Sequence, residues 1–138
     1  MTGRHNTDET TMAYINLYAV LGTLENLCRI DEEAKALIQD KKISVGFAVT
    51  GGPSATLCFD HGSCVLKNGT EHCDIRLPFS SVKKFNGMID GTVTPIPSKG
   101  FTKIGFLLKD FVRLTDILTR YLRASEEDLQ DPVFYEKS

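Results

Sequence analysis

The sequence predicts a single α+β domain, and three observations lead to this fold class. Apolar residues recur at three- and four-residue steps near both ends of the 138-residue chain, as they do in amphipathic helices. Between the ends the period falls to two, and short alternating runs are separated by turn-forming dipeptides, as in antiparallel strands. The composition, 41% apolar and 25% charged, is that of an ordinary globular protein with enough apolar residues for one core.

The first predicted element is a helix that begins at Met12. An apolar stripe through Leu17, Leu21 and Leu24 continues to residue 28, and acidic residues at 31–33 indicate the start of a second helical segment that runs to residue 40. The sequence therefore predicts two helices, or one kinked helix, before the first strand. Residues 1–11 are polar and are expected to form a flexible N-terminal tail.

Four strands are then expected, at residues 43–49, 55–59, 63–66 and 71–77. His61-Gly62 and Asn68-Gly69 are two-residue hairpin signals, so the strands are predicted to form an antiparallel meander.

The same turns predict the register of the strands. The first turn pairs Phe59 with Cys64 and Leu57 with Leu66, and sends Cys58 to the other face. The second turn sets Cys64 opposite Cys73 on the core face. Two buried free thiols are expected there, with a disulfide as the alternative under oxidation.

After Pro78 the sequence returns to helical patterns. Ser80-Ser81 caps a short helix that Gly91 closes. Pro95 and Pro97 then leave at most an edge strand around residues 101–103, because neither proline can donate to a sheet ladder. A last helix follows over residues 104–124, and residues 125–138 form an acidic tail whose Val-Phe-Tyr segment at 133–135 docks on the body or frays.

The last helix carries more apolar residues than one narrow stripe needs. Phe106, Val112 and Ile117 fall away from the line through Leu107 and Phe111. Either the sheet and the first helix cover this wide apolar face, or part of it faces a ligand cavity or a partner subunit.

No residue pattern in the chain indicates catalysis or a cofactor. Asp60-His61-Gly62-Ser63 contains the residue types of a catalytic triad, but neighbours in a turn do not converge on one reacting atom. Three cysteines at 58, 64 and 73 and the histidines at 61 and 72 lack the short spacing of zinc sites. We therefore expect a protein that is not an enzyme, with no metal and no cofactor; an enzyme that uses one of these residues is the weakest of the hypotheses.

Charge and hydropathy limit the partners. The formal net charge of −2, with acidic and basic residues intermixed, does not favour nucleic acid. No apolar run approaches the roughly 20 residues that cross a bilayer, and no signal peptide is visible, so no integral membrane segment and a cytoplasmic location are expected. The four cysteines are then expected to be free thiols.

The order of elements resembles a known family. The resemblance is carried by Cys73-Asp-Ile-Arg-Leu77, the short helix at 80–90, Gly91-Thr-Val-Thr-Pro95, and Gly100-Phe-Thr-Lys-Ile-Gly105. Together these are similar to the sterol carrier protein-2 (non-specific lipid transfer) family. The resemblance implies one domain over residues 12–124, with a five-stranded, mainly antiparallel sheet, helices packed on one face, and an apolar tunnel between sheet and helices. By matching position it implies that the tunnel is lined by Phe85, Met88, Ile89, Phe101, Ile104, Leu107, Leu108 and Phe111.

The function expected from this resemblance is the binding or carriage of a hydrophobic ligand, such as a fatty acyl chain, a sterol-like molecule or another lipid. The alternative is a non-catalytic interaction module that uses the apolar last helix and the C-terminal tail. That alternative is compatible with a homodimer.

Overall fold

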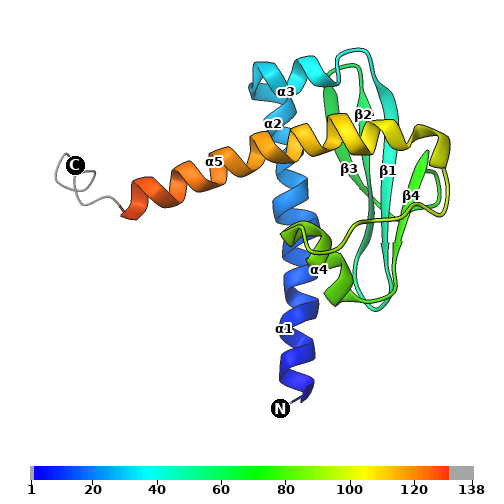
Figure 1. The fold of residues 1–138 in the computed structure, drawn as a ribbon, viewed down its shortest axis with the longest axis vertical. Helices are drawn as coiled ribbons and strands as arrows, with labels where there is room; N and C mark the ends of the chain where they lie inside the picture. The colour runs from blue at the N-terminus through cyan, green and yellow to red at the C-terminus, as the bar shows by residue number, and fades with distance from the viewer. Residues whose placement is uncertain (1, 131–138) are drawn as a thin grey trace.

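The computed structural model describes residues 2–130, which fold into a four-stranded sheet with helices on one face (Figure 1). The strands are β1 (Lys42–Val49), β2 (Ser54–Asp60), β3 (Ser63–Asn68) and β4 (Ile75–Phe79), in the spatial order β3-β2-β1-β4. The sheet is mixed, because β1 and β2 pair antiparallel, β2 and β3 pair antiparallel, and β1 and β4 pair parallel. The α+β class predicted from the sequence is therefore confirmed.

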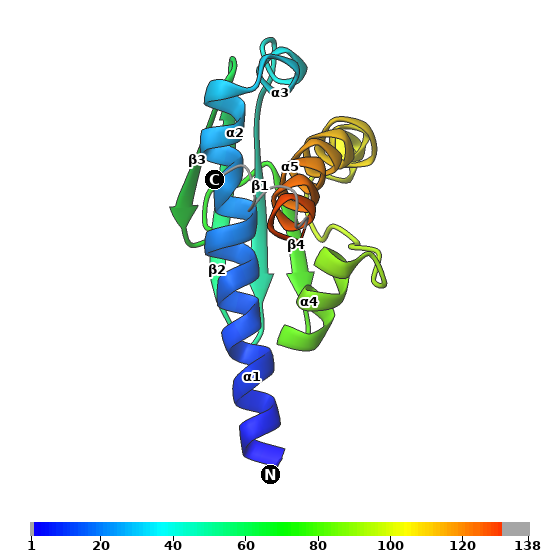
Figure 2. The same ribbon diagram turned by 90° about the vertical axis from the view of Figure 1, so that its left-hand side faces the viewer.

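The first helix is longer than predicted. It begins at Thr2 rather than Met12 and runs to Ile30, so residues 2–11, which were expected to form a flexible tail, are helical. Within it, α1 (Thr2–Tyr14) passes through a π-helical segment, Ile15–Val20, and a 3₁₀ turn into α2 (Leu24–Ile30). Figure 2 shows this helix running along the sheet and projecting beyond it at its N-terminal end.

A short helix, α3 (Glu32–Leu37), follows after a break at Asp31. The side chain of Asp31 accepts a hydrogen bond from the backbone N–H of Ala34 at 2.9 Å, which caps α3 as the acidic run predicted. The same carboxylate accepts a hydrogen bond from the Tyr121 hydroxyl of the last helix at 2.6 Å. Asp31 therefore links three helical segments.

The Tyr121 contact predicts a pH effect. The hydrogen bond from Tyr121 is the main cause that lowers the pKa of Asp31, and the bond from Ala34 adds to it. A carboxyl group with a lowered folded-state pKa stabilises the fold above its unfolded-state pKa, and this contribution is lost as the pH falls through the folded-state pKa. In Tyr121→Phe we expect the pKa of Asp31 to rise towards its ordinary value, so that this stabilising contribution becomes smaller and its loss on acidification is complete at a higher pH.

An NMR titration of the Asp31 carboxyl carbon measures this shift. The Ala34 contact remains in the variant, so its amide shift is the internal control. An unchanged Asp31 titration would show that Tyr121 does not bond to Asp31 in solution.

The register of the first three strands agrees with the sequence prediction. Phe59 pairs with Cys64, Leu57 pairs with Leu66, and Cys58 lies on the opposite face, where it pairs with Val65. The inward side chains of β1, β2 and β4 are buried, apart from the partly buried Ile43 at the start of β1, and Phe47 is fully covered. One face of the sheet is therefore the floor of the core.

The predicted meander is wrong in its last strand. After Asn68 the chain does not turn back along β3 but crosses the open face of the sheet and enters β4 parallel to β1, at the opposite edge. The crossing is held by Asp74, whose carboxylate accepts hydrogen bonds from the backbone N–H and the hydroxyl of Ser44 at 2.9 and 3.1 Å. The absence of a side chain at Gly46 leaves space for the crossing segment, since a Cβ at this position would lie 2.8 Å from the sulfur of Cys73.

This crossing also corrects the predicted cysteine pairing. Cys73 packs over Gly46 on the open face and does not face Cys64. The thiol that does meet Cys64 belongs to Cys28 of α2, and the hydrogen bond between the two thiols, together with burial, raises the pKa of Cys64. Cys64 is therefore a protonated thiol at neutral pH. All four cysteines are free in the structure.

The expected fifth strand is absent from the described part of the chain. Residues 101–103 form a 3₁₀ turn, and the crossover touches β4 at a single bridge, in which Arg76 N–H donates to Lys99 O at 3.1 Å and Ser98 N–H donates to Arg76 O at 2.9 Å. Pro95 and Pro97 have no N–H with which to extend this pairing.

The short helix α4 (Val82–Asp90) agrees with the prediction. The Ser81 hydroxyl accepts from the backbone N–H of Lys84, and Gly91 closes the helix in the left-handed conformation. The last helix spans residues 104–130 and includes a second π-helical segment, Phe106–Phe111, before α5 (Val112–Gln130). Residues 133–135 of the expected tail lie outside the described residues.

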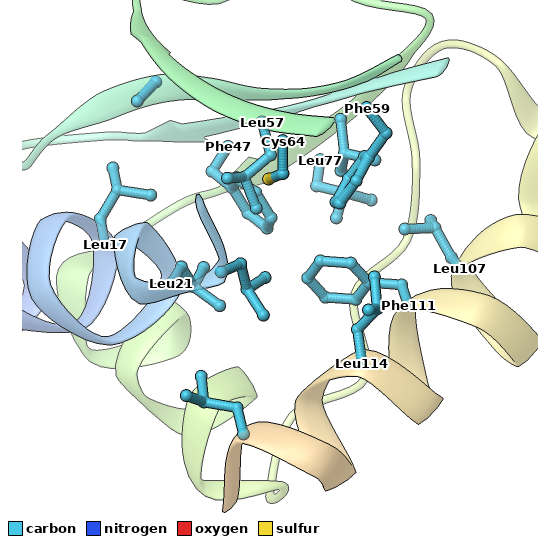
Figure 3. Close-up of a cluster of buried hydrophobic side chains, with 14 of the residues drawn as sticks. Leu17, Leu21, Phe47, Leu57, Phe59, Cys64, Leu77, Leu107, Phe111 and Leu114 are labelled. Atoms are coloured by element: carbon cyan, nitrogen blue, oxygen red, sulfur yellow. The ribbon is translucent and has the colours of Figure 1, made fainter. Parts of the chain in front are cut away.

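The helices pack on the sheet through one apolar core (Figure 3). Leu17 and Leu21 of the first helix and Leu107, Phe111 and Leu114 of the last helix point towards Phe47, Leu57, Phe59, Cys64 and Leu77 of the sheet. Within the described residues, no helix combines the length and hydropathy needed to cross a membrane.

Candidate functional site: an apolar cavity beneath the last helix

A cavity of about 300 Å³ lies between the last helix and the rest of the domain. This volume is at the lower end of the range of ligand pockets, which runs from about 300 to 1,000 Å³. Five parts of the chain form its wall: the first helix, β4, α4, the crossover and the last helix. The lining residues are Val20, Leu21, Leu77, Met88, Ile89, Val93, Thr94, Pro95, Ile104, Leu107, Leu108, Phe111, Val112, Thr115, Leu118, Thr119 and Leu122.

The last helix supplies the longest part of the wall. Its lining residues recur at three- and four-residue steps from Ile104 to Leu122, a stripe about 27 Å long at 1.5 Å per residue. Phe106, Leu114 and Ile117 of the same helix are buried in the core instead. The wide apolar face therefore divides, one side covering the sheet and the other lining the cavity. Whether a ligand or a partner subunit covers the second side stays a prediction.

Both π-helical segments contribute to this cavity. Ile15–Val20 ends in the lining residue Val20, and Phe106–Phe111 includes Leu107, Leu108 and Phe111. A π-helical turn is rare and is frequently found at functional sites. The two segments are thus a local feature that favours this cavity as the functional site.

The cavity has a buried floor and an open mouth. Leu21 and Leu77 at the floor are 2% and 1% exposed, whereas Leu108 and Leu122 at the mouth are 67% and 48% exposed. No lining residue is charged, and the polar side chains among them are three threonines. The wall can therefore desolvate an apolar molecule and offers no ion pair to it.

Six of the eight residues that the resemblance placed in a tunnel line this cavity: Met88, Ile89, Ile104, Leu107, Leu108 and Phe111. The other two do not. Phe85 is fully buried in the core, where its ring packs edge-on against Phe79 with ring centroids 5.3 Å apart. Phe101 is 64% exposed on the 3₁₀ turn, because the edge strand that would have turned it inward does not form. Ligand contact by the six lining residues remains a prediction.

Several lining residues were missed in the sequence. Leu118 and Leu122 continue the three- and four-residue steps from Phe111, so this period was sufficient to find them. Val20, Leu21 and Leu77 carried no such signal. They reach the cavity because the first helix and β4 pack against the last helix, and residues so distant in sequence are brought together only by the fold.

The residue types that suggested chemistry lie apart from this cavity. In the turn between β2 and β3, His61 Nδ1 lies 2.6 Å from Asp60 Oδ1, but the Ser63 hydroxyl donates to the Asp60 carbonyl oxygen at 2.9 Å. The serine is thus not activated by the imidazole. Within the described part of the chain, no group of three His, Cys, Asp or Glu side chains is placed to hold a metal ion.

A shallower groove adjoins the cavity along the outer edge of β4. It is more open, it includes Lys84 and the exposed Ile96, and it shares Val93, Thr94 and Pro95 with the cavity wall. The crossover therefore forms a partition between the two hollows.

Together, the mixed sheet, the helices on one face and the cavity beneath the C-terminal helix define an α+β domain built around an internal apolar site. Comparison with solved structures identifies its fold. A crystal structure of sterol carrier protein 2 matches 70% of this chain and 93% of its own chain, with a TM-score of 0.52 and 15% sequence identity. The chain has a sterol carrier protein-2-like fold.

A second solved structure is similar over much of the chain. It is the solution structure of a conserved hypothetical protein from Thermus thermophilus, described as possibly a sterol carrier protein, and it matches 72% of this chain and 82% of its own, with a TM-score of 0.49 and 15% identity. No protein-family model matches the sequence, and the comparison with curated proteins found no match.

Proposed function

We propose that this protein binds a lipid-sized apolar molecule in the cavity beneath the last helix, and that it acts by binding and carrying this molecule rather than by catalysis. The observation that carries the proposal is the cavity itself, about 300 Å³ in volume, without a charged residue in its wall. Cavities lined by leucine, isoleucine and phenylalanine side chains stay dry and take up apolar molecules.

The energetics favour such binding. Burial of apolar surface contributes about 25 cal/mol per Å², so a ligand that buries roughly 200 Å² gains about 5 kcal/mol before the cost of its immobilisation. The exposed residues at the mouth, among them Leu108 and Val112, leave a route for a ligand to enter and leave. The likeness in fold to a protein named as a sterol carrier supports the same proposal.

Native mass spectrometry of the purified protein, followed by denaturing extraction, tests the proposal directly. We expect an apolar molecule bound at about one per chain, or the uptake of one added fatty acid or sterol by the ligand-free protein. A ligand-free protein that takes up no member of a panel of fatty acids, alcohols and sterols would contradict the proposal.

A point substitution locates the site. Leu108→Glu places a carboxylate at the mouth, where the native side chain is exposed, so we expect a large loss of ligand affinity, about tenfold or more, with little loss of stability. Ile30→Glu is the matched control, because Ile30 is 72% exposed and does not line the cavity. Displacement of a fluorescent fatty acid measures both. Equal affinities for the two variants would place the ligand elsewhere.

An interaction module is the second candidate function, because Leu108, Val112 and Leu122 are apolar and exposed on one helix. A second copy of the chain that covered this stripe would close the mouth of the cavity. Sedimentation at micromolar concentration distinguishes the two functions. The interaction module would be favoured if the wild type forms dimers and takes up no ligand, and if Leu108→Glu is monomeric.

A further inference from the structure

We propose that two copies of this chain associate through the outer face of the first helix, antiparallel and about a two-fold axis. This interface does not use the cavity and does not depend on ligand binding. Three sets of observations lead to it: the apolar side chains on this face, the contacts that fix its orientation, and the charges near its ends. The outer face is defined by the exposed residues from position 8 to position 30: Asp8, Thr11, Met12, Tyr14, Ile15, Tyr18, Ala19, Thr23, Asn26, Arg29 and Ile30.

The middle of the outer face is apolar. Four large apolar side chains lie within seven residues, and each is 41 to 47% exposed: Met12, Tyr14, Ile15 and Tyr18. The rings of Tyr14 and Tyr18 stack, with centroids 6.2 Å apart. In Figure 2 the first helix lies in front of the sheet, and no other helix or strand covers its N-terminal half. A group of exposed apolar side chains of this kind is typical of a protein interaction surface.

The inner side of the first helix is held by specific contacts. Asn16 Nδ2 donates to Asn86 Oδ1 of α4 at 2.9 Å, and Asn86 Nδ2 donates to the carboxylate and the carbonyl oxygen of Glu9 at 2.9 and 3.0 Å. Ala13 and Leu17 on the same side are fully buried. Rotation of the helix about its axis would leave these buried amide groups without partners. The apolar outer face therefore stays turned away from the domain, where only another molecule can cover it.

The charges near the two ends of the outer face select a second copy as this molecule. Asp8 and Arg29 are exposed, and neither takes part in an ion pair among the described side chains. Arg29 Nη2 donates to Asn26 Oδ1 at 2.7 Å, which holds the guanidinium group on the outer face. The midpoint between Asp8 and Arg29 lies between Tyr18 and Ala19. An antiparallel pair with its two-fold axis at this midpoint sets each Asp8 beside the partner's Arg29, whereas a parallel pair sets like charges together.

The size of the outer face predicts a weak and reversible dimer. A helical face from residue 8 to residue 30 is about 33 Å long and about 10 Å wide, so each copy contributes roughly 330 Å² in projection. Even twice this area is less than the roughly 800 Å² per partner of a standard stable interface. We therefore expect a dissociation constant of about 10 to 500 µM. The tyrosines and Ile15 supply most of the affinity, and the charges set the orientation.

Sedimentation equilibrium from about 5 µM to about 1 mM covers this range and measures the dimer. Ile15→Lys places an ammonium group in the apolar middle of the interface, so we expect the dissociation constant to rise about 100-fold or more. Val65→Lys is the matched control, because Val65 is 44% exposed but lies on the open face of the sheet, and it should dimerise like the wild type. Circular dichroism shows whether each variant keeps its fold.

Charge reversal tests the antiparallel orientation. Asp8→Arg and Arg29→Asp, each made alone, set like charges together at both ends of the interface. We expect each single variant to dimerise about fivefold or more weakly than the wild type at low salt. The double variant restores both pairs in the opposite sense, so its dissociation constant is expected to return to within about threefold of the wild-type value.

The outcomes are distinct for the interface and for its orientation. A wild type that stays monomeric over the whole concentration range would overturn the inference. So would dimers that persist in Ile15→Lys and are lost in Leu108→Glu, because the last helix would then form the interface. Single charge reversals without effect, or a double variant that does not recover, would overturn the antiparallel orientation. None of these results depends on ligand uptake, which tests the proposed function separately.

Discussion

Replacement of Phe47 by alanine is expected to lower the free energy of unfolding by about 3 to 5 kcal/mol. Phe47 is fully buried on β1, and its ring lies 6.1 Å from the ring of Phe85 on α4 and 6.1 Å from the ring of Phe111 on the last helix, measured between centroids. One side chain thus joins the sheet to two helices that form the cavity. Urea denaturation followed by circular dichroism measures the loss.

The same substitution is expected to weaken ligand binding, because Phe111 lines the cavity and loses its support from the sheet. Phe101→Ala is the control, since Phe101 is 64% exposed and its loss should change stability by no more than about 0.5 kcal/mol. A loss below about 1 kcal/mol in Phe47→Ala would mean that the ring is not packed between the two helices.

The second large effect is expected for Gly100→Ala, with a loss of about 2 to 5 kcal/mol. Gly100 has φ = +81°, a conformation that costs an L-residue about 1 to 2 kcal/mol. A Cβ at this position would also lie 2.1 Å from the carbonyl oxygen of Asp74. Because the backbone fixes the position of a Cβ and the Asp74 oxygen is itself a backbone atom, no side-chain rotation relieves the clash, and the bridge between Lys99 and Arg76 must open.

Gly91→Ala separates the two contributions to this loss. Gly91 has nearly the same angle, φ = +83°, but a Cβ there would meet no atom within 4 Å. It should therefore show the conformational cost alone, about 1 to 2 kcal/mol. Hydrogen exchange at the Arg76 and Ser98 amides reports whether the bridge opens in Gly100→Ala only. Equal losses in both variants would exclude the clash as the cause.

The helices and the first three strands were predictable because their signals are local. The stripe through Leu17, Leu21 and Leu24 specifies a helix with one buried face, and the His61-Gly62 turn specifies the pairing of Phe59 with Cys64. The caps of α4 at Ser81 and Gly91 are single residues whose effect is confined to one turn. In each case residues within a few positions of one another determine the conformation.

The edge of the sheet depended on distant residues. Asn68-Gly69 is a strong hairpin signal, yet β4 lies beside β1, because Asp74 bonds to Ser44 and Cys73 fills the space left by Gly46, contacts between residues 27 to 30 positions apart. The prolines at 95 and 97 were recognised in the sequence as obstacles to a strand, and they are the reason that the resemblance overestimated the sheet by one strand.

The sequence by itself therefore determined the fold class, the positions of the helices apart from the extension of the first one to Thr2, the register of β1 to β3 and the apolar character of the last helix, since each follows from local periodicity or turn chemistry. Only the tertiary structure decided where β4 pairs, that Phe85 and Phe101 lie outside the cavity, and that Val20, Leu21 and Leu77 line it. The physical reason is that a cavity is the space left when distant elements pack together, and its wall is a property of that packing rather than of any one segment.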